Sequence, residues 1–402
     1  MPKLPNVIHY HPSDDTKLPK TRLEIYEGAI KHNLQAFRQA MGDQVRLAPG
    51  VKGNGFGTDA VSVAQILQEN GSEFTFVNSV PEALELREAG LTIPILITGY
   101  VAEHEESDLV QLDSTHQIIS SLDMLKRLNT AAKAAYKNVK AHIMIDTGIN
   151  REGFKVTNND ELQQLVTHLK DHSSNLDLVG VCTHFATADG VTEKEIAIYN
   201  QQLKNFKNIH AQLKEHDFNF EYTHSANSAA TLRDIGAGQE FFNLARPGIS
   251  LFGPYPDDQV QAEIEARGIT LKQATSFKTE VIEIKEVAAS EIVGYAGTFT
   301  AEQPVKVALL PVGYYEGIKR RESNNGFVLI NGKRRKILGR VSMHYTAVEA
   351  DDDTKLHDEV VIWGQQGAEF IDLKEIYNRV GTNPHNIMLA VNNTVQRVLI
   401  HN

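Results

Sequence analysis

A single lysine ends the first strongly apolar run of the chain and leads into a glycine-rich turn. The stretch reads LAPGVKGNGFGTD, with Lys52 followed by glycines at positions 53, 55 and 57. Glycine allows a backbone to approach a ligand closely. A partly desolvated lysine releases its proton more readily, and its free amine is a nucleophile for aldehydes. Taken alone, Lys52 is more typical of an ordinary solvated turn.

Further along the chain, other polar residues stand where apolar runs end. His184 closes one run in THFATADG, His224 closes the next in THSANSAA, and Arg246 closes the last in ARPGI. Each histidine, taken singly, is more typical of a satisfied structural residue than of a catalyst. Their chemistry therefore depends on whether the fold brings these run ends together.

The spacing of apolar residues predicts that the fold brings the ends of these runs together. Between residues 45 and 250, short apolar runs alternate with amphipathic stretches such as 59–70, 122–136 and 193–216. Eight alternations predict a (β/α)8 TIM-type barrel, with an open doubly wound sheet as the alternative. In a barrel, the carboxyl ends of all strands surround one mouth, where active sites lie. The expected strands are 45–51, 74–78, 94–99, 117–121, 140–146, 178–185, 220–225 and 242–247.

The residues after the last two expected strands are suited to binding a phosphate. Ser228 begins a helix-like segment and offers a hydroxyl beside free backbone N–H groups, with Asn227 just before it. Gly248 and Ile249 let the next loop present further N–H groups. Barrels build phosphate sites from the loops after strands seven and eight. A phosphate there and an amine at Lys52 predict a phosphorylated aldehyde cofactor, and pyridoxal 5′-phosphate fits.

Beside such a cofactor, Arg246 would affect which reaction is favoured. Arginine does not give up its proton in proteins. If it faced the pyridine nitrogen, Arg246 would donate a hydrogen bond without protonating the ring. The ring would then be a weaker electron sink than one paired with Asp or Glu. This arrangement favours simple removal and return of a proton at Cα and suppresses transamination.

After about residue 265 the apolar pattern changes to a period of two. The runs 276–287, 305–314 and 358–364 predict strands, and 372–381 predicts one helix that interrupts them. Asn331-Gly332 lies between two strand-like runs and predicts a tight hairpin, because both turn residues tolerate positive φ. We therefore expect a proline-rich N-terminal arm (1–20), the barrel (21–265) and a mainly β C-terminal domain (266–402).

Composition narrows the class of protein. The chain has 402 residues and a formal net charge of -11, which argues against a nucleic-acid partner. No apolar run approaches the ~18 residues needed to span a bilayer, and the N-terminus does not resemble a signal peptide. The single cysteine, Cys182, excludes an internal disulfide and fits a reducing compartment. We expect a cytoplasmic protein with no membrane partner and no metal site.

Ten ordered blocks of the chain resemble the alanine racemases, which are fold-type III pyridoxal-phosphate enzymes. The resemblance covers nearly the whole chain after residue 20, and the order of the blocks makes it specific. It implies an isomerase that interconverts L- and D-alanine. It also implies a homodimer, in which the β domain of one chain caps the barrel mouth of the other. The blocks are EIYEGAIKHNL, VKGNGFG, EALELREAG, DTGINREGF, THFATADG, HSANSAATL, RPGISLFGPYP, VGYAGTF, PVGYYEG and GRVSM.

The resemblance also implies roles for individual residues. Lys52 would form the internal Schiff base and handle the proton of the D-enantiomer. The partner subunit's Tyr295 would be the second base, on the opposite face of the cofactor. It would remove or return the Cα proton of the L-enantiomer. Arg151 and the backbone at Met343 would hold the substrate carboxylate, and His184 would link the cofactor arginine with the tyrosine. The residues expected to bind the cofactor are Lys52, Phe56, His184, His224, Asn227, Ser228, Arg246, Gly248, Ile249 and Tyr314.

Four positions depart from the family pattern. Phe56 stands where many members have a tyrosine whose hydroxyl reaches the phosphate, and losing such a hydrogen bond costs ~1.5–3 kcal/mol. Met144 replaces a lysine that is often carbamylated to steady Arg151, which then needs an anion or an acidic neighbour. His344 stands where Asp is usual, and His385 replaces a tyrosine common at the inner gate. These changes leave the two expected bases intact but bear on the substrate range.

Three other functions compete with alanine racemisation. A racemase that prefers serine or another amino acid would share every block. A pyridoxal-phosphate carrier or homeostasis protein would have the barrel alone, without the β domain. A fold-type III decarboxylase would need a cysteine in its C-terminal domain, whereas Cys182 lies in the expected barrel.

Overall fold

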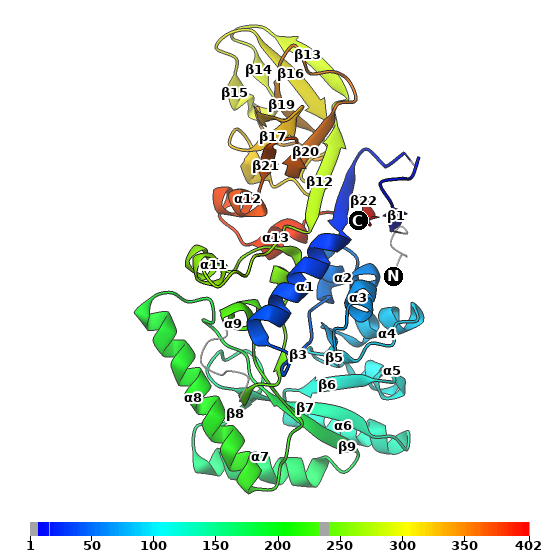
Figure 1. Cartoon of the computed structure of the whole chain (residues 1–402), viewed down its shortest axis with the longest axis vertical. Coiled ribbons are helices and arrows are strands. Elements are labelled where there is room, and N and C mark those ends of the chain that lie inside the picture. The colour runs from blue at the N-terminus through cyan, green and yellow to red at the C-terminus, as the bar shows by residue number, and fades with distance from the viewer. Residues whose placement is uncertain (1–6, 16, 234–240, 402) are drawn as a thin grey trace.

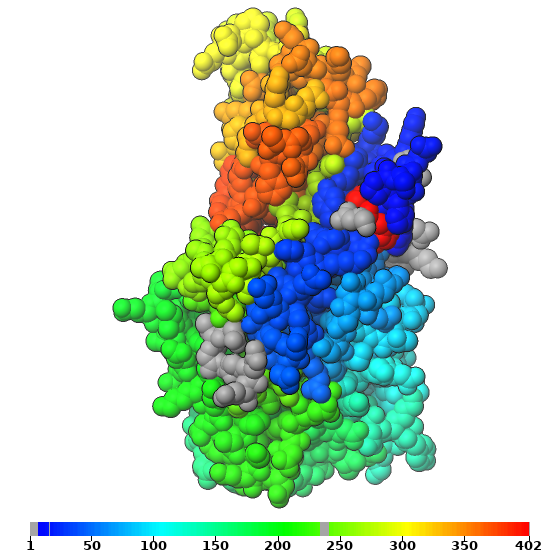
Figure 2. All heavy atoms as spheres, viewed as in Figure 1, coloured from blue at the N-terminus to red at the C-terminus, as the bar shows by residue number. Residues whose placement is uncertain are grey.

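The computed structural model describes residues 7–15, 17–233 and 241–401, which form two units stacked along the long axis of the molecule. Figure 1 shows the α/β unit below and the β-rich unit above. The space-filling view shows the upper unit as the narrower of the two (Figure 2).

The lower unit is a barrel of parallel strands, as predicted. Its strand order is β3-β11-β10-β9-β7-β6-β5-β4, and a parallel bridge between Gly50 and Phe76 joins the two ends. Backbone bonds from Phe74 N to Leu47 O (3.0 Å) and from Val51 N to Phe76 O (2.9 Å) continue this seam. All eight expected runs supply one strand each. They are β3 (Arg46–Leu47), β4 (Thr75–Val77), β5 (Ile95–Ile97), β6 (Thr115–Ile119), β7 (Val139–Asp146), β9 (Leu176–Cys182), β10 (Tyr222–His224) and β11 (Leu244–Ala245).

Helices cover the outside of the barrel because each buries one apolar stripe. In α3, which forms within the amphipathic stretch 59–70, Val63, Ala64 and Leu67 are fully buried. The Asp59 side chain caps the helix by accepting from Ser62 N (2.7 Å). The helices are α1 (Glu27–Met41), α2 (Lys52–Gly57), α3 (Ala60–Glu69), α4 (Val80–Glu88), α5 (Glu106–Gln111), α6 (Leu122–Ala134), α7 (Asn159–His172), α8 (Glu193–Glu215), α9 (Ser228–Arg233) and α11 (Asp258–Glu265); the short strand β8 (Phe154–Lys155) pairs with β7.

The upper unit contains two main sheets and a small hairpin. The larger sheet has the order β1-β22-β2-β12-β20-β17-β18, with β21 on β20; the second is β13-β16-β19; and β14 pairs with β15. The strands are β1 (Ile8–Tyr10), β2 (Arg22–Tyr26), β12 (Thr275–Glu280), β13 (Glu283–Val287), β14 (Ile292–Val293), β15 (Phe299–Thr300), β16 (Val305–Leu310), β17 (Phe327–Ile330), β18 (Lys333–Lys336), β19 (Thr346–Ala350), β20 (Glu359–Gln366), β21 (Glu369–Ile371) and β22 (Gln396–Ile400).

Both ends of the chain meet in the larger sheet. β1 and β2 each run parallel to β22, and the space-filling view shows the blue N-terminal segment against the red C-terminal strand (Figure 2). The described part of the N-terminal arm thus includes a paired strand, where we expected a segment without periodicity. The boundaries at residues 20 and 265 stay a prediction.

Two local expectations are confirmed and one is wrong. The Asn331-Gly332 hairpin joins β17 to β18, with φ of 52° and 69° at its two turn residues, and α12 (Leu373–Val380) forms in the expected stretch. The run 276–287 is not one strand. It divides into β12 and β13, because residues up to 280 pair within the larger sheet while residues from 283 pair with β16. A second short helix, α13 (Pro384–Met388), was not expected.

A buried arginine ties the C-terminal strand to the turn after Lys52. Arg397 is 3% exposed and donates from Nη2 to Gly57 O (2.8 Å) and Val391 O (2.9 Å), and from Nη1 to Val395 O (2.7 Å). These bonds join β22, in the upper unit, to α2 at the top of the barrel.

We expect Arg397→Met to lower the free energy of unfolding by about 3 kcal/mol or more. The reason is that several buried carbonyls lose their donor, at about 1–3 kcal/mol each. Thermal and denaturant unfolding of the whole chain will measure the loss. Lys336→Met, on the exposed strand β18, is the control and should change stability by less than about 0.5 kcal/mol. If Arg397→Met and Lys336→Met had the same free energy of unfolding, Arg397 would not stabilise the junction between the two units.

Candidate active site

Lys52 lies at the mouth of the barrel, where α2 begins after the first strand. Its Nζ lies 5.6 Å from the centre of the Phe76 ring, and among the described residues it forms no ion pair. Burial lowers the pKa of Lys52, and the positive charges of Arg151 and Arg246 lower it further, against a smaller opposing effect of Glu82. A desolvated amine with a lowered pKa, free of any carboxylate, is suited to attack an aldehyde.

The turn after Lys52 runs in the left-handed region. φ lies between 52° and 63° at Gly53, Asn54, Gly55 and Phe56. Glycine and asparagine tolerate this conformation, whereas a bulky residue such as phenylalanine is strained in it. The strain is tolerated because the Phe56 ring is 4% exposed and packs at 5.6 Å from the ring of Phe252.

The backbone and hydroxyl groups expected to bind phosphate converge. Ser228 begins α9, as predicted, and its Oγ accepts from Gly248 N (2.9 Å) and more weakly from Ser250 N (3.4 Å). The Asn227 side chain accepts from Ala230 N (3.0 Å), so Asn227 caps α9. Ile249 begins the short 3₁₀ segment Ile249–Phe252. The Ser228 hydroxyl and the backbone N–H groups of this segment thus converge in a cradle of a kind that suits an anion.

Phe56 lies against this cradle. A Cβ at Gly248 would approach the Phe56 ring to 3.3 Å, and the centre of the His385 ring lies 5.6 Å from that of Phe56. Two departures from the family pattern, Phe56 and His385, are therefore neighbours, and Phe56 lies beside Gly248. A third departure, His344, contacts Glu316 through Nδ1 (2.7 Å) instead.

Arg246 is a buried cation held by neutral groups. It is 7% exposed, donates from Nη2 to Thr183 O (3.1 Å), and contacts His224 Nδ1 through Nη1. No carboxylate forms an ion pair with Arg246 in the described part of the chain. Burial lowers its pKa, yet a guanidinium stays protonated under all ordinary conditions.

His184 belongs to the same electropositive mouth. Burial, then the charges of Arg246, Arg151 and Lys52, lower its pKa to about 3. His184 is therefore neutral at physiological pH. The structure brings it together with these three cations, whereas the expected link from His184 to a tyrosine stays a prediction.

Arg151 has an acidic neighbour in place of a carbamylated lysine. Its Nη2 donates to Glu152 Oε1 at 2.8 Å, and its side chain is 56% exposed. The lysine's position holds Met144, which is buried with its sulfur 3.7 Å from that of Cys182. The Glu152 carboxylate is thus the acidic neighbour of Arg151 that the sequence analysis required.

Tyr295, Tyr314 and Met343 belong to the upper unit of the chain. Tyr295 is 70% exposed and begins the turn between β14 and β15. Figure 1 shows these two strands at the end of the upper unit away from the barrel. Tyr314 N donates to Ser342 O (3.0 Å), which places Tyr314 beside the Met343 segment. The two expected bases are therefore not brought together within one chain.

Sequence reasoning missed two buried histidines of the barrel core. His116 on β6 and His142 on β7 lie in hydrogen-bond contact, and His142 in turn contacts His224. Histidines inside otherwise apolar strand runs were the signal that could have identified them. Thr183, which binds Arg246, was also missed, because its role depends on a backbone carbonyl.

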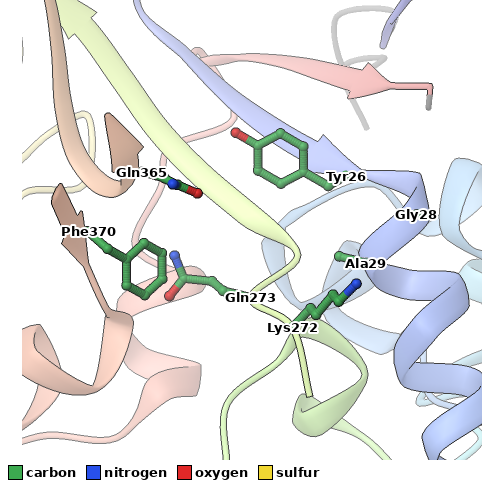
Figure 3. A pocket seen from close by; sticks show the side chains of 7 residues that line it. All are labelled: Tyr26, Gly28, Ala29, Lys272, Gln273, Gln365 and Phe370. Atoms are coloured by element: carbon green, nitrogen blue, oxygen red, sulfur yellow. The ribbon is translucent and has the colours of Figure 1, made fainter. Parts of the chain in front are cut away.

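A cavity of about 520 Å³ lies at the junction of the two units, away from the barrel mouth. Figure 3 shows Tyr26, Lys272, Gln273, Gln365 and Phe370 around it. None of the expected site residues lines this cavity, so it is not part of the candidate active site.

Comparisons with known proteins agree over both units. The model of the alanine racemase N-terminal domain matches residues 25–256, and that of the alanine racemase C-terminal domain matches residues 274–399. The chain is 34% identical over 383 residues to "Alanine racemase 2" of Caldanaerobacter subterraneus subsp. tengcongensis, covering 95% of each chain. It is 34% identical to the alanine racemase of Desulforamulus reducens, covering 94% of this chain and 98% of the relative.

A solved structure extends the likeness to three dimensions. The alanine racemase of Bacillus anthracis with bound L-Ala-P shares 30% identity with this chain and superposes with a TM-score of 0.87 over 96% of each chain. Among the described residues, no helix is both long enough and apolar enough to cross a membrane.

The opposing charges around Lys52 give a test in the protein without cofactor. Because Arg151 lowers the pKa of Lys52 and Glu152 raises it, Arg151→Gln should leave less free amine at a given pH, and Glu152→Gln should leave more. Labelling of Lys52 by an amine-reactive reagent across a pH series, followed by peptide mass spectrometry, will measure both. The labelling midpoint should move up in the first variant and down in the second, with exposed Lys336 as an internal control. Shifts in the same direction would contradict the electrostatic account.

Proposed function

The chain belongs to the alanine racemase family, and from this premise we propose that it interconverts L- and D-alanine by proton transfer at Cα between two bases, Lys52 and the partner subunit's Tyr295. The cofactor of the family is pyridoxal 5′-phosphate. The observation that carries the proposal is the desolvated, carboxylate-free amine of Lys52, which lies in a barrel mouth that also contains an anion cradle and a buried arginine.

The described residues fit this cofactor on chemical grounds. Lys52 would hold its aldehyde, and the Ser228 hydroxyl with the N–H groups of Gly248 and Ile249 would hold its phosphate. Arg246 would hold its ring nitrogen. When bound, the cofactor supplies an electron-withdrawing ring that makes the Cα proton of the substrate acidic.

Arg246 favours racemisation over competing chemistry. Its guanidinium donates hydrogen bonds and does not transfer a proton to a ring nitrogen. A cofactor ring beside Arg246 would therefore withdraw electrons less strongly than one beside a carboxylic acid. Arg246 would thereby favour return of the proton to Cα, which is the outcome that racemisation requires.

The two bases face different energetic demands. Burial lowers the pKa of Lys52, so more of its amine is free to accept a proton at a given pH than in a solvated lysine. The tyrosine must first give up its phenolic proton before it can act as a base. The positive charges of Arg246 and Arg151 around the mouth would favour the phenolate, and the neutral His184 would not oppose it.

A homodimer would complete the site. Tyr295 is exposed on its own chain, and the same β-rich unit has further exposed apolar or aromatic side chains at Ile292, Met343 and Tyr345. Exposed side chains of this kind are enriched in protein interfaces. We propose that this surface of one subunit covers the barrel mouth of the other, where Arg151 and the backbone at Met343 hold the substrate carboxylate.

Racemisation of another amino acid is the second candidate function. His385 favours it, because an imidazole replaces the longer phenol common at the inner gate and its ring lies beside Phe56. The carrier and decarboxylase functions are not favoured, since the C-terminal racemase domain is present. The single cysteine in the sequence supports a reducing, cytoplasmic location as a further proposal.

We expect Tyr295→Phe to bind the cofactor but lose racemisation by at least about 10²-fold, because only a base is removed. Chiral chromatography of products from L-alanine, L-serine and L-lysine will measure the reaction. Lys52→Ala should lose both cofactor binding and turnover. Full turnover by the phenylalanine variant would refute the two-base assignment.

Mixing the two inactive variants tests the dimer. If Tyr295 acts in trans, a Lys52→Ala and Tyr295→Phe mixture will regain up to about a quarter of wild-type activity, because half of the dimers are mixed and one of their two sites is intact. If Tyr295 acts within its own chain, no mixed dimer contains an intact site and activity will stay at the level of the separate variants.

We expect His385→Tyr to raise the ratio of kcat/KM for alanine over that for serine, by about threefold or more, since a phenol narrows the gate. Steady-state kinetics of both variants with both amino acids will measure it. His104→Asn, which alters an exposed histidine of the short helical segment Glu103–Glu105, is the control. An unchanged ratio in His385→Tyr would exclude a gating role.

A further inference from the structure

Three histidines form a continuous hydrogen-bonded chain through the barrel core to Arg246. His116 Nδ1 lies 2.8 Å from His142 Nε2, His142 Nδ1 lies 2.7 Å from His224 Nε2, and His224 Nδ1 contacts the guanidinium of Arg246. All three imidazoles are buried, at 3%, 0% and 0% exposed. The chain spans strands β6, β7, β10 and β11.

The fold makes room for this chain at one point. Strand β9 lies between β7 and β10, and Gly180 of β9 pairs with both His142 and Tyr222. A Cβ at position 180 would overlap the His142 ring. Tyr222 stacks on the His142 ring, with centroids 5.4 Å apart. A glycine and a stacked tyrosine thus let His142 reach across β9 to His224.

The chemistry of arginine fixes the direction of every hydrogen bond in the chain. A guanidinium only donates, so His224 Nδ1 must be an acceptor and His224 Nε2 must bear the proton. The same reasoning makes His142 accept at Nδ1 and donate from Nε2, and makes His116 accept at Nδ1. Burial, first, and neighbouring positive charges lower the pKa of all three histidines, which agrees with neutral rings.

This direction excludes a proton wire to the active site. A wire would need a terminal group that gains and loses protons, and arginine does neither in proteins. The chain instead presents three aligned dipoles whose acceptor ends point toward Arg246. Hydrogen bonds in such a series strengthen one another at low dielectric. They lessen the cost of burying a guanidinium without a carboxylate.

We propose that His116, through His142 and His224, is a positioning residue that holds the Arg246 guanidinium in place for the cofactor ring. The inference rests on the proposed function, in which Arg246 binds the ring nitrogen. His116 touches neither substrate nor cofactor in this scheme. Its contribution is an acceptor at Nδ1, without which the His142 N–H has no buried partner and the acceptor that faces Arg246 weakens.

Two replacements separate the hydrogen bond from packing. Asparagine carries an oxygen near the place of the histidine Nδ1, whereas leucine fills similar space without any acceptor. We expect His116→Leu to lower kcat for alanine about tenfold, with KM changed less than twofold and pyridoxal 5′-phosphate bound more weakly. His116→Asn should restore at least half of the lost kcat. His210→Leu alters a half-buried histidine of α8 whose Nε2 lies 3.4 Å from Thr223 Oγ1 of β10; it is the matched control and should stay within twofold of wild type.

Equal loss in the leucine and asparagine variants, or kcat within twofold of wild type in His116→Leu, would overturn the proposal. If the leucine variant does not fold, the ring tautomers of the three histidines test the proposal instead. Long-range 1H–15N spectra of the wild-type protein labelled with 15N-histidine, without cofactor, should show His116, His142 and His224 as neutral Nε2–H tautomers. An Nδ1–H tautomer at His142 or His224 would overturn the proposal. Absence of racemisation in the wild type would refute the proposed function alone, since the tautomers are measured independently of activity.

Discussion

The burial of a guanidinium without a carboxylate is the constraint on which the barrel mouth depends. Moving an ion into the protein interior costs several kcal/mol unless polar groups surround it. Arg246 is surrounded by a backbone carbonyl and a neutral imidazole, so its positive charge is not cancelled. This charge helps to lower the pKa of Lys52 and that of His184. The mouth is therefore electropositive, which suits both a phosphate and a carboxylate.

The two units supply different parts of the proposed site. The barrel supplies the amine, the anion cradle and the buried arginine, all on strand ends that meet at one rim. The β-rich unit carries Tyr295 on an exposed turn between β14 and β15, two strands that Figure 1 shows at the end of the unit away from the barrel. The Arg397 bonds to Gly57 and to the C-terminal segments join the two units near Lys52. In the proposed homodimer, this joint would fix the Tyr295 turn of one subunit relative to the barrel mouth of the other.

The departures from the family pattern are compensated locally. Met144 and Cys182 form an apolar pair in the barrel core with Phe76, Leu96 and Ile118, so no charged group is left in the position of the usual lysine. Arg151 pairs with the next residue in the chain, a carboxylate that the sequence supplies beside it. Phe56 keeps its strained backbone through ring packing in place of a phosphate contact.

Local periodicity and turn chemistry were enough to predict the alternation of strands and helices, the eight barrel strands, the Asn331-Gly332 hairpin and the residues at the barrel mouth. The order of residues encodes these features directly. Long-range packing, in contrast, determines that the run 276–287 divides between two sheets, that β1 and β2 pair beside β22, and that Glu152 is the partner of Arg151. It also decided that His116, His142 and His224 form one chain, because hydrogen bonds between residues 26 and 82 positions apart depend on strand register and on the space left by Gly180.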